Sequence, residues 1–489
     1  MRRTLLPLLP LAALLATLLA PAPAQAVNTD DLRARQSTLE RAATSAPLQS
    51  DNLVHETWRP GQAGISGCFL RTAAIYVSSG LDSLQVWDVS DPAAPALTGV
   101  LPNAMFQNEA MTCGERRTAD GVERFALIGV DLFQVSPGDI QHFNVGGGEL
   151  IVVDVTDPSA PAIRSRTSGL TSTHTVACVD DRDCRFAYSA GDSDGGYSIF
   201  DLRDLDAPKE LDGDRATAGT QPFSSPTAGH KWDFDAAGYG THTGWNGASM
   251  WDVSKPRKPK LVTTTGKVGR GEHPDYPGWN DFILHNSIRP NAQRFKPNAK
   301  PSLRNGNILL VGEEDYEETD CSLAGSFQTW WVKRLDGRKN AIKPLAKVEL
   351  ADLGTFPVPH GGFCSTHWFD FHPSGLVAIG FYGGGTHVVD VTNPRRITPY
   401  GHSIWGGSEV WDARWVPVYK DGVRTKRRTD LLYSIDLVRG LDVYRVGLPG
   451  APAAARAAED SSGSGVVPMG MVGVAVLASL ALGRLRRAR

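Results

Sequence analysis

The residues of this chain that are best suited to chemistry are four histidines at equivalent places in a repeated pattern. His174, His230 and His367 each open an apolar stretch at a similar distance before the end of a predicted strand, and His285 occupies the matching place in a repeat with a longer insertion. Neutral imidazole is a common protein ligand for Fe, Cu, Zn and Ni. If the repeats bring these positions together, the four histidines could hold a transition-metal ion.

Two acidic residues, Glu109 and Glu409, occupy the matching strand start in other repeats. A carboxylate behind a ligating imidazole orients the ring and raises its basicity, so these two are the candidate outer partners of the metal. The same set also fits a second explanation, in which the residues are hydrogen-bonded polar linings of a wet channel or caps carried by the repeat.

Other chemical motifs give little. The sequence contains no Gly-x-Ser-x-Gly, P-loop or His-Glu-x-x-His pattern, so no catalytic or cofactor-binding residue is assigned. The acidic stretches 191–196 and 312–320 offer oxygen ligands for Ca²⁺, but neither has EF-hand spacing, and we expect solvated turns. We also expect the basic run 420–428 to be a solvated hairpin tip, and contact with anionic wall polymers is the alternative role.

The repeat that sets these positions is an apolar strand followed by an aspartate and a proline-punctuated turn. Residues 150–161 read Leu-Ile-Val-Val-Asp-Val-Thr-Asp-Pro-Ser-Ala-Pro, and related stretches surround Asp88, Asp201, Asp252 and Asp390. β-Branched residues favour a buried strand, the aspartate can accept from amides two residues on, and proline ends the strand. Two degenerate units, one within 281–350 and one ending at 440–446, raise the predicted number of units to seven.

Seven units with a period of roughly 40–50 residues predict an all-β, seven-bladed β-propeller over residues 52–446. The first strand of each blade lines the central channel, so the histidines should converge there. The isolated strand at 53–58 can complete the last blade and close the ring. An array of two-sheet sandwiches is the alternative fold.

The two ends of the chain predict export and anchoring. Residues 1–26 resemble a signal peptide, with the general secretory route favoured over twin-arginine export, and 27–51 form a loosely attached N-terminal segment. A flexible linker at 447–465 leads to a predicted C-terminal transmembrane helix at 466–483 and a basic cytoplasmic tail at 484–489. The propeller should therefore be extracytoplasmic and held at the cell membrane.

Six cysteines in an exported chain indicate disulfides, with buried free thiols as the alternative. Cys178 and Cys184 flank a tight polar turn and are the first pair expected. Pairing across neighbouring blades then leaves Cys68 with Cys113 and Cys321 with Cys364, although the sequence alone does not fix these pairs.

The repeats at 150–158 and 387–394 resemble the LVIVD-repeat family of secreted bacterial β-propellers. That resemblance implies the fold and a surface location, and it carries no general biochemical activity. The stretch Cys-Ser-Thr-His-Trp-Phe-Asp-Phe-His-Pro at 364–373 is more faintly similar to the selenium-binding and methanethiol oxidase propellers.

Two functions remain open. The first is a membrane-anchored surface module that binds a protein or polysaccharide, and the second is an extracytoplasmic metal-dependent oxidoreductase that uses the channel histidines. A formal net charge of -3 does not indicate the excess of basic residues that is typical of a nucleic-acid-binding protein. If the four histidines do not approach one another, the binding module is the one candidate function that remains of these two.

Overall fold

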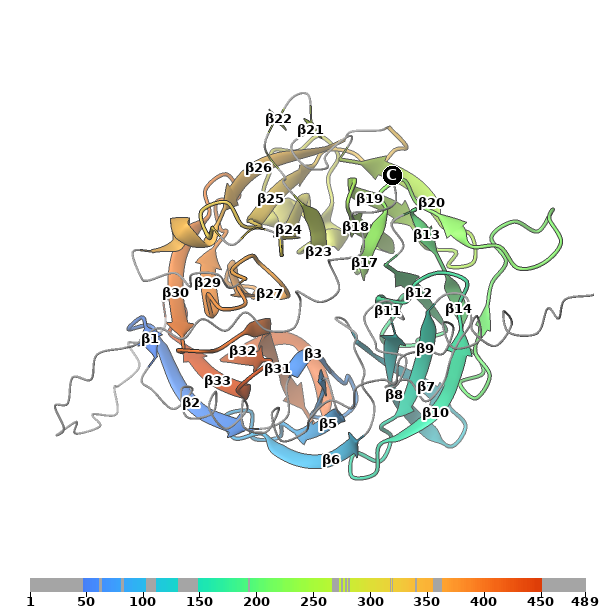
Figure 1. Cartoon of the computed structure of the whole chain (residues 1–489), viewed down its shortest axis with the longest axis horizontal. Helices are drawn as coiled ribbons and strands as arrows, with labels where there is room; N and C mark the ends of the chain where they lie inside the picture. Colours follow the sequence, from blue (N-terminus) through green and yellow to red (C-terminus); the bar gives the residue numbers. More distant parts are fainter. Residues whose placement is uncertain are drawn as a thin grey trace, which may run out of the picture.

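The strands form seven antiparallel sheets around a central axis, as the sequence predicts (Figure 1). The computed structural model describes residues 47–60, 64–80, 83–102, 111–130, 148–191, 194–265, 272–273, 276–277, 279, 282–316, 318, 320–338, 341–354 and 363–450. We name the sheets blades A to G in chain order, and the strands are given below from the inner edge of each blade outward.

Blade A consists of β3 (Gly64–Phe69), β4 (Ile75–Gly80), β5 (Ser83–Asp88) and β6 (Ala96–Pro102). Blade B consists of β7 (Thr112–Thr118), β8 (Gly121–Val130), β9 (Glu149–Asp154) and β10 (Ala162–Ser168). Blade C consists of β11 (Thr175–Cys178), β12 (Phe186–Ala190), β14 (Ile199–Asp201) and β15 (Lys209–Glu210). Blade D consists of β17 (Gly229–Phe234), β18 (Tyr239–Gly244), β19 (Gly247–Asp252) and β20 (Lys260–Thr264). Blade E consists of β23 (Ile283–Ile288), β24 (Ile308–Glu314), β25 (Phe327–Val332) and β26 (Ile342–Val348).

Blade F consists of β27 (Phe369–Phe371), β28 (Leu376–Gly380), β29 (Thr386–Asp390), β30 (Thr398–Ile404) and β1 (Leu48–Gln49). Blade G consists of β31 (Val410–Lys420), β32 (Val423–Asp436), β33 (Gly440–Val446) and β2 (Leu53–Pro60). Two short ladders, β13 (Gly196–Tyr197) with β16 (Phe223–Ser224) and β21 (Glu272–His273) with β22 (Tyr276–Pro277), and the 3₁₀ turns η1 (Ala292–Arg294), η2 (Leu303–Asn305) and η3 (Leu350–Leu353) complete the described elements.

The repeated aspartate ends the third strand of its blade and caps the turn that follows. Asp154 accepts the N–H of Thr156 at 2.8 Å, which is the bond that the sequence predicts for this motif. The other four copies make the same bond to the residue two positions on, at 2.8 Å for Asp88, 3.1 Å for Asp201, 2.9 Å for Asp252 and 2.7 Å for Asp390. The motif therefore marks the same structural position, the end of the third strand, in each of these five blades.

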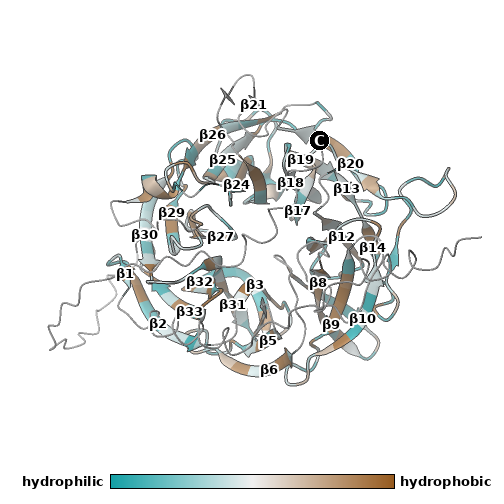
Figure 2. Ribbon diagram, in the orientation of Figure 1, coloured by the Kyte–Doolittle hydropathy of each residue, from teal (hydrophilic) through white to brown (hydrophobic). Residues whose placement is uncertain are grey.

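The apolar residues of the middle strands pack between neighbouring blades. Between blades A and B, for example, the buried side chains Val77 and Val86 belong to the same cluster as Ile128 and Ile151. The hydropathy colours show β9 largely brown, whereas the outer strand β10 carries teal residues (Figure 2). One four-stranded sheet cannot cover both of its faces, so each blade depends on the next and the ring must close.

The N-terminal strand closes the ring in blade G, as predicted. β2 runs antiparallel to β33, with Leu53 opposite Val446 (Figure 1). A buried cluster secures the junction: the Arg439 guanidinium donates to Asp442 at 2.8 Å and lies 3.8 Å from the centre of the Trp405 ring. The propeller also begins earlier than expected, because β1 lies in the segment predicted to be loosely attached and instead pairs with β30.

All three expected disulfides are present: Cys68–Cys113, Cys178–Cys184 and Cys321–Cys364. Because disulfides persist outside the reducing cytosol, they suggest an extracellular location.

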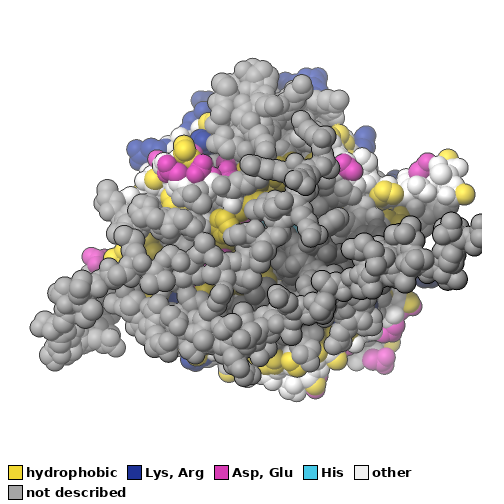
Figure 3. All heavy atoms as spheres, in the orientation of Figure 1, with side chains coloured by type: hydrophobic (Ala, Val, Ile, Leu, Met, Phe, Trp, Pro, Cys, Tyr) yellow, Lys and Arg dark blue, Asp and Glu magenta, His cyan; other side chains and the backbone are white. Residues whose placement is uncertain are grey.

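The predicted terminal segments lie outside the described residues, including the signal peptide at 1–26, the span at 466–483 and the tail at 484–489. Among the described ranges, none of the helices has the length and apolar character needed to cross a bilayer. Figure 3 shows acidic and basic side chains next to each other at the upper left edge of the face in view.

The basic hairpin between β31 and β32 is not the freely solvated tip that the sequence suggests. Arg424 donates to the Phe69 carbonyl at 3.0 Å and forms an ion pair with Asp181, and Tyr419 donates to the Leu70 carbonyl at 2.7 Å. The prediction was wrong for Arg424 because a run of charges does not reveal which member has a partner on another blade.

Candidate metal centre

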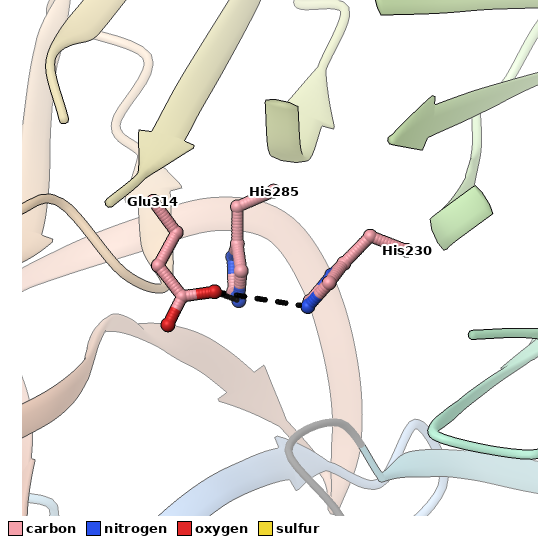
Figure 4. Close-up of side chains that lie close together, drawn as sticks. All are labelled: His230, His285 and Glu314. Atoms are coloured by element: carbon pink, nitrogen blue, oxygen red, sulfur yellow. Dashed lines mark ion pairs between the residues drawn. The ribbon is translucent and has the colours of Figure 1, made fainter. Parts of the chain in front are cut away.

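Two of the four predicted histidines lie at β-bulges in the inner strands of neighbouring blades. The register shifts between Gly229 and Lys231 in β17 and between Leu284 and Asn286 in β23, so His230 and His285 are the extra residues. A bulge breaks the alternation of side chains along a strand and re-aims the inserted one. In Figure 4 both rings point toward the same place on the channel side.

Hydroxyl groups from the neighbouring blade fix the backbone of both bulges. Thr175 donates to the carbonyl of His230 at 2.6 Å, and Thr243 donates to the carbonyl of His285 at 2.9 Å. Each histidine is therefore held by two blades, which limits how far its ring can move when a ligand binds.

The four predicted histidines approach one another in chain order, and all four are buried. His174 Nε2 lies 3.1 Å from His230 Nε2, and the His285 ring lies 4.2 Å from the rings of both His230 and His367. The sequence prediction that these side chains converge matches this geometry. They form an arc of imidazoles contributed by blades C, D, E and F.

The distance between His174 and His230 fits two different chemical states. In the first state the two rings form a hydrogen bond, in which the N–H of one imidazole donates to the lone pair of the other. Alternatively, both nitrogens could bind one ion, because two nitrogens at about 2.0–2.1 Å from a metal and 3.1 Å from each other subtend roughly 100°. That angle is ordinary for adjacent ligands, so the spacing of the two nitrogens suits a shared ion.

Glu314 joins the histidines from the last position of β24, where it is buried opposite Ile283. Its Oε2 lies 3.8 Å from His230 Nε2 and 3.7 Å from His285 Nε2 (Figure 4). The ligand atoms of these three residues all lie within 4.8 Å of one another. Two imidazoles and one carboxylate therefore meet at a buried point between blades D and E.

Tyr382 holds the other oxygen of this carboxylate. Its hydroxyl donates to Glu314 Oε1, and its backbone adopts the left-handed conformation, with φ 47°. A non-glycine residue in that region costs on the order of 1–3 kcal/mol and persists where surrounding contacts enforce it. Here the N–H and C=O of Tyr382 both bond Val410 at 2.9 Å, so the ring is fixed over the cluster.

His367 has a tautomer suited to ligation. Its Nδ1 lies 2.7 Å from the Trp411 carbonyl, so Nδ1–H donates and Nε2 carries the lone pair. Metal-binding histidines commonly donate their second N–H in this way.

The two predicted outer partners have different outcomes. Glu409 accepts from the indole N–H of Trp411 at 2.9 Å, and the backbone carbonyl of the same tryptophan accepts from His367 Nδ1–H. Burial raises the pKa of Glu409, while the Trp411 hydrogen bond and the nearby His367 oppose that shift. Glu109 lies outside the described residues.

Glu314 and Tyr382 are the members of the cluster that the sequence analysis missed. The stretch 312–320 was expected to be a solvated turn, but Glu313 and Glu314 are buried and end strand β24. The available signal was the apolar run 308–311, followed after Gly312 by two glutamates, in the same blade as His285. Tyr382 gave no signal, because it follows β28 in a glycine-rich turn with no motif.

Comparison with known families finds the LVIVD repeat. The family model described as LVIVD repeat matches residues 75–101 and 144–167, which lie in and around blades A and B. No match is found among curated proteins.

Among solved structures, the chain is similar to the β-propeller domain of Cps50 (Swd1) from Myceliophteria thermophila. The sequence identity is 11% and the TM-score 0.49, over 81% of this chain and 99% of that one. The fold assignment rests on the blade order and strand registers described above.

Proposed function

Because the chain is a seven-bladed β-propeller that carries LVIVD repeats, we propose that it is an exported propeller whose channel binds a transition-metal ion and uses it in oxidoreductase chemistry. The observation that carries this proposal is the meeting of His230, His285 and Glu314 at one buried point. A buried carboxylate beside two imidazoles is costly to desolvate, and a bound cation offsets that cost.

The donor set favours iron. Two histidines and one carboxylate with open positions are typical of mononuclear Fe(II) sites, whereas soft sites for Cu(I) use sulfur ligands. His174 adds a third imidazole next to His230, and His367 adds a fourth next to His285. Imidazole-rich sites also accept Cu²⁺, Ni²⁺ and Zn²⁺, so the choice of metal is part of the test.

Metal analysis of the purified full chain tests the proposal. We expect about one ion per chain by elemental analysis after reconstitution with Fe²⁺ under anaerobic conditions, and loss of that ion in His230→Ala and His285→Ala. His402→Gln, a histidine on the outer strand β30, is the matched control and should retain the ion. A wild-type chain that binds none of Fe²⁺, Cu²⁺, Ni²⁺ and Zn²⁺ stoichiometrically overturns the metal centre.

An interaction module is the second candidate function, and it is compatible with the first. Exposed apolar side chains on the outer strands of neighbouring blades favour it: Leu97 and Val100 on β6 and Ile163 on β10. We propose that the propeller is held at the cell surface by residues 466–483 and presents such faces to proteins or polysaccharides. Fractionation of cells that express the full chain, or a chain ending at residue 465, tests the anchor: only the full chain should remain with the membranes.

A further inference from the structure

A cavity of about 380 Å³ lies between blades C and D, at the level of their third strands and apart from the histidine cluster. This volume is at the small end of the range for ligand sites. Its lining comes from β13, β16, the end of β19, the loop after β15 and the motif turn of blade D.

The floor of the cavity is aromatic. Tyr197 and Trp251 are buried, with their rings 6.2 Å apart, and Phe223 stacks on Tyr197 at 5.6 Å. The β13–β16 ladder places Tyr197 directly opposite Phe223, so the backbone fixes this stack. Phe223 is only half-buried, so it offers the most exposed ring of the three to a ligand with a flat apolar face.

One wall is formed by the segment that follows β15. The Asp212 carboxylate accepts the N–H groups of Asp214 and Gln221, both at 3.1 Å, and Gly213 donates to the Gln221 carbonyl at 2.8 Å. These bonds shape the loop without a ligand, which lowers the ordering cost of binding.

The rim of the cavity is basic. Arg257 is neutralised through its ion pair with Asp201, but Arg215 and Lys258 are exposed and form no ion pair with any described residue. Asp212 is the one carboxylate in the lining, so the rim retains positive charge.

The motif turn of blade D differs from its counterparts in the first two blades. Between its two prolines, the motif has Ala93 and Ala94 in blade A and Ser159 and Ala160 in blade B. In blade D the same two positions hold Arg257 and Lys258, and both line the cavity. Blade F also has a basic pair at these positions, Arg395 and Arg396, so the pair of blade D is distinguished by lining the cavity.

We propose that this cavity binds a six-membered ring that has one apolar face and carries a carboxylate. An acidic sugar of a polysaccharide has this chemistry: its ring C–H groups cover the aromatic floor, and its carboxylate pairs with Lys258 and Arg215. A free aromatic carboxylic acid has the same chemistry from a different source. The site is independent of the proposed metal.

Calorimetric titration of the full chain tests this site. The probes are a galacturonic acid trimer, the neutral galactose trimer and benzoate. We expect saturable binding of the galacturonic acid trimer, at least tenfold weaker binding of the neutral trimer, and weakening with salt. The double variant Arg215→Ser/Lys258→Ser should lose at least tenfold in affinity for the acidic trimer.

The matched control is Lys255→Ser/Lys260→Ser, which removes the same charge from two exposed residues that do not line the cavity. Its affinity should equal that of the wild type. Binding of benzoate without the trimer supports the ring-and-carboxylate site with a small aromatic acid as its source. The proposal is overturned if neither acid binds, or if the control loses as much affinity as the cavity variant.

Discussion

The histidine arc of blades C to F and the arginine pairs of blade G surround buried carboxylates in two unlike ways. On the arc of blades C to F, the buried carboxylate Glu314 faces imidazoles. In blade G, buried carboxylates pair with arginines: Asp412 on the inner strand β31 accepts from Arg414 at 2.8 Å, and Asp442 on β33, farther out in the blade, accepts from Arg439 at 2.8 Å and also contacts His55 at 2.7 Å. The two regions share one scaffold and similar burial, but they differ in the partner of each acid.

That difference separates a structural site from a candidate reactive one. An arginine stays protonated and donates to its carboxylate permanently, so the pair cannot accept an ion. A histidine can lose its proton and offer a lone pair to a metal. The nature of the partner, more than the depth of burial, therefore identifies where a ligand can enter.

Breaking an arginine pair should have the largest effect on stability. Arg439→Ala removes the guanidinium partner of the buried Asp442, which then keeps only its 2.7 Å contact with His55 among the described ion pairs, and it also removes the contact with Trp405. We therefore expect the free energy of unfolding to fall by about 3 kcal/mol, the lower end for a broken buried pair. Urea denaturation followed by tryptophan fluorescence measures it. Arg182→Ala, in an exposed pair with Asp180, is the control and should change stability by less than about 1 kcal/mol. Equal effects would remove the distinction between the buried and exposed pairs.

The acid of the histidine arc should show the opposite pattern. Glu314→Gln keeps the size of the side chain but replaces the charged ligand with a neutral amide. Loss of a residue that only supports a ligand lowers metal affinity by up to about 100-fold, so we expect the loss of a ligand charge to lower it by at least that much. The stability of the fold should change little. Competition with a chelator measures the affinity. Asp412→Asn is the counterpart in blade G, and its metal affinity should match that of the wild type.

Removing the hydroxyl that holds Glu314 should have a smaller effect on the metal. Tyr382→Phe keeps the ring and the backbone bonds to Val410, so we expect a 10–100-fold loss of metal affinity with the fold intact. The visible absorption spectrum of the Co²⁺-loaded chain should also change, because the carboxylate is then free to rotate. An unchanged spectrum and affinity would show that Tyr382 does not position Glu314.

A histidine away from the channel should titrate as part of the core. Burial lowers the pKa of His387 from 6.5 to about 3, against the opposing hydrogen bond to the Gly384 carbonyl. Below pH 6.5 the unfolded chain binds a proton that the folded chain does not, so this contribution is intact above pH 6.5 and is lost as the pH falls toward 3. The expected slope is about 1.4 kcal/mol per pH unit.

Unfolding free energies at pH 7.0 and 5.5 measure this slope. His387→Gln keeps an N–H that can donate to Gly384 and does not titrate, so its stability should fall less between the two pH values than that of the wild type. Identical slopes for the variant and the wild type would mean that His387 is protonated in the folded chain.

The sequence predicts the propeller and the convergence of the histidines because both follow from a repeat. Once Asp88 and Asp154 mark equivalent turns, any residue at a fixed offset returns to the same ring position. The bulges at His230 and His285 depend on how each inner strand pairs with the second strand of its blade, and no residue type marks them in the sequence, although β3 and β31 shift register at the matching place. Glu314 was missed for a related reason: its partners come from another strand and another blade.

The closure of the ring also orders the folding of the chain in time. Glu56 on β2 and Arg445 on β33 form an ion pair across 389 residues of sequence. Joining points so far apart costs about 5 kcal/mol of chain entropy if the residues between them are unstructured, and much less once the intervening blades have formed. A chain that emerges amino end first must therefore keep β2 unpaired until blade G appears. Once β33 has formed, its free edge can accept the β2 strand of another molecule in place of its own, so the junction that seals one ring is also where two chains could exchange strands.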